Sequence, residues 1–274
     1  MAAAVKVGEV FGEKDERFAA SLGKQLQIYA VQRKYRDAIG PAKRLVAVRE
    51  TAYGADHFLV GAALNDLAGL HKDLEKNDEA SPLYERALAI GEKAGDSGGP
   101  LVAIVLNNLA EIYRDQKKLD EAETAVARSL ALREKLYGPR HDAYADGLRT
   151  FATIHAARGK HAEAETLYRQ VLAIRRRRQI WNRPVMMEAM VGVAGACAAQ
   201  DKNEPAETFY KAALRTGEGG LGRNDDIRAD AFEQYADLLK KLKRDDEANQ
   251  MAEQARIIRS RMAGSDVTPP SVSK

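Results

Sequence analysis

Apolar residues recur along most of the chain with the spacing of amphipathic helices. One segment places Leu64, Leu67 and His71 at i, i+3 and i+7, which is one face of a helix. A second segment repeats this spacing, with the apolar positions Ala80, Tyr84, Ala87 and Leu88. Lys76 lies between the two segments, where a cation complements the C-terminal dipole of the first helix. The pattern predicts two helices joined by a short turn.

The same pair of segments returns every 42 residues, in six copies and without an insertion. One slot holds alanine in every copy: Ala38, Ala80, Ala122, Ala164, Ala206 and Ala248. A small residue at a helix crossing permits close approach, and a larger one would cost roughly 1–3 kcal/mol. Because no hairpin can bury its apolar stripe alone, the hairpins must stack. We therefore predict an all-α, right-handed solenoid of about six stacked helix–turn–helix repeats.

The repeats define the expected domain organisation. One solenoid is predicted over residues 15–262, preceded by a lead segment at 1–14. The remainder, 263–274, ends in the Pro/Ser-rich sequence "GSDVTPPSVSK", whose composition predicts disorder.

These columns resemble the tetratricopeptide repeat, whose signature alternates large and small residues on two helices. In the third copy the signature reads Leu106, Leu109, Ala110, Tyr113, Ala122, Val126 and Ser129. The 42-residue spacing, with "LNNLA" and "LYERALAIGEK", is similar to the variant found in kinesin light chains and bacterial multi-repeat proteins. The resemblance implies a non-catalytic scaffold that binds a protein or peptide partner.

The family resemblance also implies a binding groove, because the first helices of such repeats line a concave surface that holds a peptide or helix. The positions carried over are Asn65, Asp66, Lys72, Asp73, Asn107, Asn108, Glu111, Arg114, Asp115, Arg149 and Thr150. An asparagine amide can donate to and accept from a ligand's main chain, and Lys72, Arg114 and Arg149 could select among ligands by charge. Alternatively, the three asparagines bond to the adjacent repeat and set the stacking angle.

A basic cluster, Arg175, Arg176, Arg177 and Arg178, ends the second helix of the fourth copy. Between residues 158 and 183 there are eight Lys/Arg and two acids. Such a cluster could bind nucleic acid or an anionic surface, or it could be a solvated helix end whose cations suit the dipole. No aromatic residue is interleaved within the run 175–178 and the net charge is only +3, both of which argue against nucleic acid.

Catalytic and metal chemistry are not indicated. The single cysteine, Cys197, excludes an intramolecular disulfide framework and a cysteine-based zinc site. The five histidines do not assemble a metal site, and no nucleophile–base pair or phosphate loop is present. We expect no enzymatic activity, no cofactor, no metal and no small-molecule substrate.

No apolar run approaches the roughly 20 residues that span a membrane. The opening "MAAAVKVGEV" lacks the sustained apolar core of a signal peptide. The cytoplasm is therefore the expected compartment, or the periplasm if an export signal has been removed.

The first helix of the fifth copy, "MMEAMVGVAGACAAQ", is apolar on the face that should be polar. Gly192 and Gly195 inside a helix cost roughly 1 kcal/mol each relative to alanine. Either something packs closely against them, such as a ligand or another subunit in a self-associating module, or this helix is a weak point.

The asparagines provide a first test. Changing Asn65, Asn107 and Asn108 together to alanine should abolish partner binding and leave helicity and melting temperature nearly unchanged, if these residues face a ligand. Circular dichroism melting and a binding assay measure both effects. A fall in melting temperature of many degrees would show that the asparagines are structural.

Overall fold

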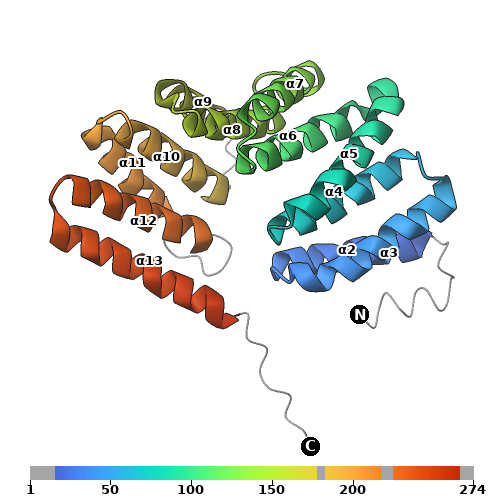
Figure 1. The fold of residues 1–274 in the computed structure, drawn as a ribbon, viewed down its shortest axis with the longest axis horizontal. Coiled ribbons are helices and arrows are strands. Elements are labelled where there is room, and N and C mark those ends of the chain that lie inside the picture. The colour runs from blue at the N-terminus through green and yellow to red at the C-terminus, as the bar shows by residue number, and fades with distance from the viewer. Residues whose placement is uncertain (1–15, 178–182, 217–224, 266–274) are drawn as a thin grey trace, which may run out of the picture. The chain divides into compact units, whose positions relative to one another are not determined.

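The computed structural model describes residues 16–177, 183–216 and 225–265 of the 274-residue chain. The described residues contain twelve α-helices and one short 3-10 helix and no strand, which confirms the all-α class (Figure 1). The predicted lead segment, 1–14, and residues 266–274 of the predicted tail lie outside the described residues. The chain divides into two compact units, residues 1–139 and 140–274, which are taken in turn.

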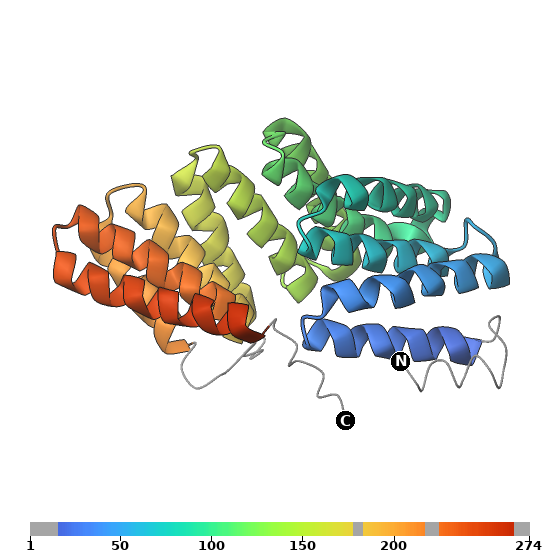
Figure 2. The same cartoon turned by 60° about the horizontal axis from the view of Figure 1, so that its bottom comes forward.

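Unit 1 contains the first three copies, and each copy is a pair of helices. The helices are α2 (Glu16–Val31), α3 (Tyr35–Tyr53), α4 (Phe58–Asp73), α5 (Asn77–Lys93), η1 (Gly95–Gly98), α6 (Gly99–Asp115) and α7 (Leu119–Tyr137). The two helices of each hairpin lie side by side (Figures 1 and 2), and α3 packs on α4 and α5 on α6 between copies. The first helices of the second and third copies, α4 and α6, therefore lie between their own partners and the preceding hairpin.

Unit 2 contains the last three copies. Its helices are α8 (Asp142–Ala157), α9 (His161–Arg177), α10 (Arg183–Ala198), α11 (Asn203–Thr216), α12 (Asp225–Lys241) and α13 (Asp245–Ser265). Here α9 packs on α10 and α11 on α12. None of the described helices of either unit is long and apolar enough to cross a membrane.

The alanine column lies at the centre of the hairpins. All six of its members have an exposed fraction of 0%. Each lies in the first turn of a second helix, where the neighbouring helix packs closely against its methyl group. The packing reason that the sequence gives for the 42-residue period is therefore visible in every copy.

The turn inside each hairpin repeats one backbone conformation. The residue before the turn cation has a positive φ, between 57° and 76°, at Arg33, Glu75, Lys117, Gly159, Asp201 and Lys243. This left-handed residue lets the next N–H reach back into the helix, as Lys76 N–H donates to the His71 carbonyl at 2.9 Å. Only Gly159 is the residue type that adopts this conformation without strain.

Two loop histidines have a structural role that the sequence pattern alone does not explain. His57 and His141 precede α4 and α8, and the Nδ1 atom of each accepts a hydrogen bond from the backbone N–H two residues later, at 3.2 and 3.1 Å. Each imidazole thus satisfies an N–H that the first turn leaves without a helical partner.

The fifth copy resolves the question of its glycines. A Cβ atom on Gly192 would lie 2.5 Å from the ring of Tyr168, a residue of α9 in the preceding copy. The close neighbour is therefore the chain's own aromatic side chain. Gly195 is less restricted, because a Cβ there would lie 3.4 Å from the Gln234 side chain and 3.7 Å from the Tyr210 hydroxyl.

The two glycines make a matched pair for experiment. Gly192→Ala should destabilise unit 2 by about 1–2 kcal/mol, because overpacking against Tyr168 outweighs the gain of roughly 1 kcal/mol in helix propensity. Gly195→Ala should be neutral or stabilising. Thermal melts of both variants check this, and equal melting temperatures for the two would contradict the packing explanation.

Candidate functional site

The predicted groove residues of the second and third copies lie on two first helices of unit 1. Asn65, Asp66, Lys72 and Asp73 lie on α4, while Asn107, Asn108, Glu111, Arg114 and Asp115 lie on α6. We call these nine residues the groove face. Its composition, four acids and two bases, makes it acidic.

Two of the three asparagines bond to each other. Asn108 Nδ2 donates to Asn65 Oδ1 at 3.1 Å, which joins α6 to α4. Asn65 Nδ2 in turn lies 3.4 Å from an Asp66 oxygen. Asn107 is buried, with an exposed fraction of 5%. This bond between adjacent repeats is the one expected if Asn65 and Asn108 set the stacking angle. Of the two side-chain oxygens, that of Asn108 is left as the acceptor available to a ligand.

The cations proposed to select ligands are engaged within the chain. Lys72 forms an ion pair with Glu111, and both side chains are largely shielded from solvent. Arg114 pairs with Asp115 at 2.6 Å. These pairs neutralise two of the four acids on the groove face, so its remaining charge is carried by Asp66 and Asp73.

Asp66 and Asp73 have no ion pair within the described residues. Both carboxylates reach solvent, yet the protein around them restricts hydration, and this desolvation raises the pKa of each. Beneath them the Tyr84 side chain is fully buried, and its hydroxyl has no hydrogen-bond partner in the described structure. Desolvation, followed by the charges of Glu111, Asp73 and Asp66, raises the pKa of Tyr84. The charges of three groove-face acids thus act on the Tyr84 hydroxyl, and of these acids only Asp66 and Asp73 have no ion pair within the described residues.

An exposed apolar side chain lies next to these polar groups. Ile104 on α6 has an exposed fraction of 45%, and it lies four residues before Asn108, so the two share a helix face. Ile104 is not among the groove positions that the sequence predicts, because apolar residues on α6 fit the pattern of core residues and only its exposure distinguishes it.

The remaining predicted groove residues, Arg149 and Thr150, belong to α8 of unit 2. Arg149 forms an ion pair with Glu188 at 2.7 Å, and Thr150 is fully buried. Both residues therefore belong to a different unit from the groove face.

The basic cluster is not one uniform surface. Arg175 is buried and forms ion pairs with Asp142 and Asp146 of α8. Arg176 and Arg177 are exposed at the end of α9, and Arg178 lies outside the described residues. Arg175 therefore stabilises the fourth hairpin, and only its two described neighbours are open to an anion.

The turn cations have a role beyond the helix dipole. Lys202 Nζ reaches back 2.8 Å to Glu165 of the preceding copy, and Arg244 does the same to Glu207 at 2.8 Å. We call these two contacts the glutamate ladder, since the partners are separated by 37 residues in both. Glu165 accepts hydrogen bonds from Lys202 and from other side chains around it, which lower its pKa to about 2. Glu207 accepts hydrogen bonds from Arg244 and from other side chains around it, which also lower its pKa to about 2.

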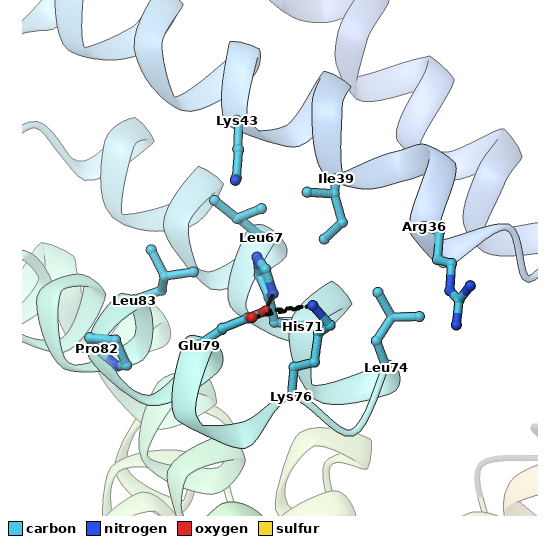
Figure 3. Close-up of a pocket in the computed structure, with 10 residues that line it drawn as sticks. All are labelled: Arg36, Ile39, Lys43, Leu67, His71, Leu74, Lys76, Glu79, Pro82 and Leu83. Carbon is cyan, nitrogen blue, oxygen red and sulfur yellow. Dashed lines mark hydrogen bonds and ion pairs between the residues drawn. The ribbon is translucent and has the colours of Figure 1, made fainter.

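In unit 1 the ladder slot carries no glutamate at either junction: it holds Ser81 in the second copy, and a cleft lies between the first and second copies. The slot that holds Glu165 and Glu207 holds Ile39 in the first copy. The cleft has a volume of about 900 Å³ and is lined by residues of α3, α4 and α5 (Figure 3). Its lining combines apolar side chains with Arg36, Lys43, Lys76, His71 and Glu79. No cluster of three or more metal-ligating side chains was found there or elsewhere in the described residues.

The family model described as "Tetratricopeptide repeat" matches residues 10–93 and 101–177, more than half of the chain. The chain belongs to the tetratricopeptide repeat family. This confirms the resemblance seen in the sequence. Proteins of this fold generally mediate protein–protein interactions.

Solved structures support the same fold at low sequence identity. BtubC (BKLC) from P. vanneervenii is 17% identical with a TM-score of 0.63, covering 89% of this chain and 96% of that one. A putative kinesin light chain with TPR-like repeats from Podosopora anserina is 21% identical with a TM-score of 0.58, covering 75% and 98%. The Rap protein complexed with competence and sporulation factor is 14% identical with a TM-score of 0.60, covering 94% and 84%. No curated protein sequence matches significantly.

The glutamate ladder predicts an acid-sensitive contribution to stability. Because the folded pKa of Glu165 is depressed, its stabilisation is present above the unfolded pKa near 4.3 and is lost as pH falls toward about 2. Between pH 5 and pH 2.5 the free energy of unfolding should therefore fall less in Glu165→Gln than in wild type. The difference should be about 1–2 kcal/mol, a value reduced because solvent screens the partly exposed Lys202.

Thermal or urea unfolding across this pH range measures the difference. Glu163→Gln, on the exposed side of the same helix, is the matched control and should follow the wild type. Parallel pH profiles for Glu165→Gln and wild type would contradict the ladder's contribution.

Proposed function

We propose that this chain is a non-catalytic protein-interaction scaffold whose groove face in unit 1 captures a basic, extended segment of a partner protein. The observation that carries the proposal is the charge balance of α4 and α6. Lys72 and Arg114 are neutralised by Glu111 and Asp115, whereas Asp66 and Asp73 form no ion pair with a described residue and are influenced only by more distant cations, Arg49 for Asp66 and Lys72 and Arg33 for Asp73. A lysine or arginine of a ligand supplies the missing charge.

The groups around these acids suit a peptide. The Asn108 amide can bond to a ligand's main chain regardless of its sequence. Ile104, one turn earlier on α6, offers an apolar anchor with about half of its surface exposed. A segment with a basic residue near an aliphatic one therefore matches the groove face in charge, hydrogen bonding and polarity.

The fold provides a precedent for ligand capture. The structure of the Rap protein, which shares the fold, is of a complex with competence and sporulation factor. For this chain we expect an affinity on the order of micromolar, or about −8 kcal/mol, because a short exposed segment must lose conformational freedom on binding.

Two other functions stay predictions with distinct tests. Binding of nucleic acid or an anionic surface through Arg176 and Arg177 would weaken steeply with salt and disappear on neutralising both residues. Self-association would appear as a concentration-dependent mass in light scattering. The burial of Arg175 in ion pairs favours the scaffold over the first of these.

The acids of the groove face provide the decisive test. A basic partner segment, identified by affinity capture from the native host and mass spectrometry, is synthesised and titrated by calorimetry. Asp66→Asn combined with Asp73→Asn should weaken binding about tenfold, or 1.4 kcal/mol. The matched control, Arg176→Ser with Arg177→Ser, should bind as the wild type does.

The pH dependence gives a second readout. Because the pKa of Asp66 and of Asp73 is raised by desolvation, both carboxylates become neutral at a higher pH than an ordinary aspartate near 3.9. Affinity for the basic segment should fall as pH is lowered from 7 to 5, and the double Asn variant should lose that dependence. Unchanged affinity in the double variant would overturn the proposed site.

A further inference from the structure

The cleft between α3, α4 and α5 is a second interaction surface, formed mainly by second helices rather than by the groove face. Its floor consists of aliphatic side chains, including Ile39 from α3, Leu67 from α4 and Leu83 from α5. Figure 3 shows Lys43 pointing from α3 toward Leu67 of α4. The lining residues come from the first and second copies only, so the cleft lies entirely within unit 1.

The cleft lies at one of the two junctions of unit 1, neither of which has a glutamate in the ladder slot, since the second copy holds Ser81 there. At the junctions of the last three copies, the turn cation bonds to a glutamate of the preceding copy. The corresponding cation here is Lys76, and the corresponding slot is Ile39. Lys76 bonds instead to Glu79 of its own hairpin, at 3.2 Å, and His71 Nδ1 also lies 2.7 Å from that carboxylate.

The other cations of the cleft have no acidic partner. Arg36 and Lys43 are exposed, and neither forms an ion pair with any described residue. Glu79, the single acid of the lining, is already engaged by Lys76 and His71. The cleft therefore presents two uncompensated positive charges above an aliphatic floor.

We propose that this cleft binds an acidic–apolar peptide segment of a partner, in which an Asp or Glu side chain meets Lys43 and Arg36 and a neighbouring large apolar side chain packs on Ile39 and Leu67. The ligand carboxylate compensates the charges of Lys43 and Arg36, which form no ion pair with a described residue. This site is separate from the groove face and opposite to it in charge preference.

The dimensions and polarity favour a short peptide segment. A volume of about 900 Å³ is within the range of sites that bury several side chains. Apolar burial supplies most of the affinity, and the two cations supply the preference for acids. The open rim allows the peptide chain to enter and leave on either side of the buried side chains.

The experiment begins with a defined random library. Twelve-residue peptides displayed on phage are selected on the full chain, and the most enriched sequence is synthesised with a fluorescein label and titrated by fluorescence anisotropy. We expect enriched peptides to carry Asp or Glu within two residues of Leu, Ile or Phe. Replacing the acids of that peptide by their amides should weaken binding about tenfold.

Two variants of the chain locate the site. Ile39→Glu restores the ladder residue beside Lys76 and should weaken peptide binding at least tenfold, with Ile39→Val as the control that retains binding. Lys43→Glu reverses a charge on the exposed rim without disturbing the core, and it should weaken binding similarly. Asp66→Asn with Asp73→Asn should leave this peptide's affinity unchanged, which separates this site from the groove face.

Several outcomes would overturn the proposal. Enriched peptides without paired acidic and apolar residues would do so, as would wild-type affinity in both Ile39→Glu and Lys43→Glu. Vesicles of phosphatidylcholine with one-third phosphatidylserine test the other anionic partner. Vesicle binding that is lost in Lys43→Glu, with no peptide selected, would assign the cleft to a membrane surface instead.

Discussion

The structure depends on how closely the two helices of each hairpin approach at the alanine column. Six alanines, 42 residues apart, are fully buried, so each methyl group is enclosed by its neighbours. Any larger residue would separate the helices and turn the apolar stripes away from the next hairpin. The stacking within each unit follows from this spacing, and so does the position of every side chain that projects from the stack.

A fixed backbone explains how two surfaces of opposite charge preference can exist within one unit. The groove face uses first helices, α4 and α6, and its unpaired charges are acids. The cleft uses mainly second helices, α3 and α5, and its unpaired charges are the cations Arg36 and Lys43. Because the backbone repeats, each surface is defined by which side chains lack the partner that another copy provides, and not by a special fold.

The helices were predictable because their signal is repeated six times, and the columns place each turn within a residue or two. The contacts between copies were not. The Asn65–Asn108 and Lys72–Glu111 pairs join residues about 40 positions apart, and a column read copy by copy does not show which neighbour a flexible side chain will choose. The close packing of Tyr168 on Gly192 depends on an aromatic ring from another helix. The sequence pattern assigns the groove-face residues to the two first helices α4 and α6, whereas the burial of Arg175 and Asn107 required coordinates.

The left-handed turn residue has a consequence for engineering. Five of the six turns hold a side chain in a backbone conformation that favours glycine, at Arg33, Glu75, Lys117, Asp201 and Lys243. These turns belong to different hairpins, so relieving each one should act independently of the others. The array thus contains five equivalent, adjustable positions through which its thermal tolerance can be tuned in small additive steps, and of these Glu75 lies beside the cleft, between its lining residues Leu74 and Lys76.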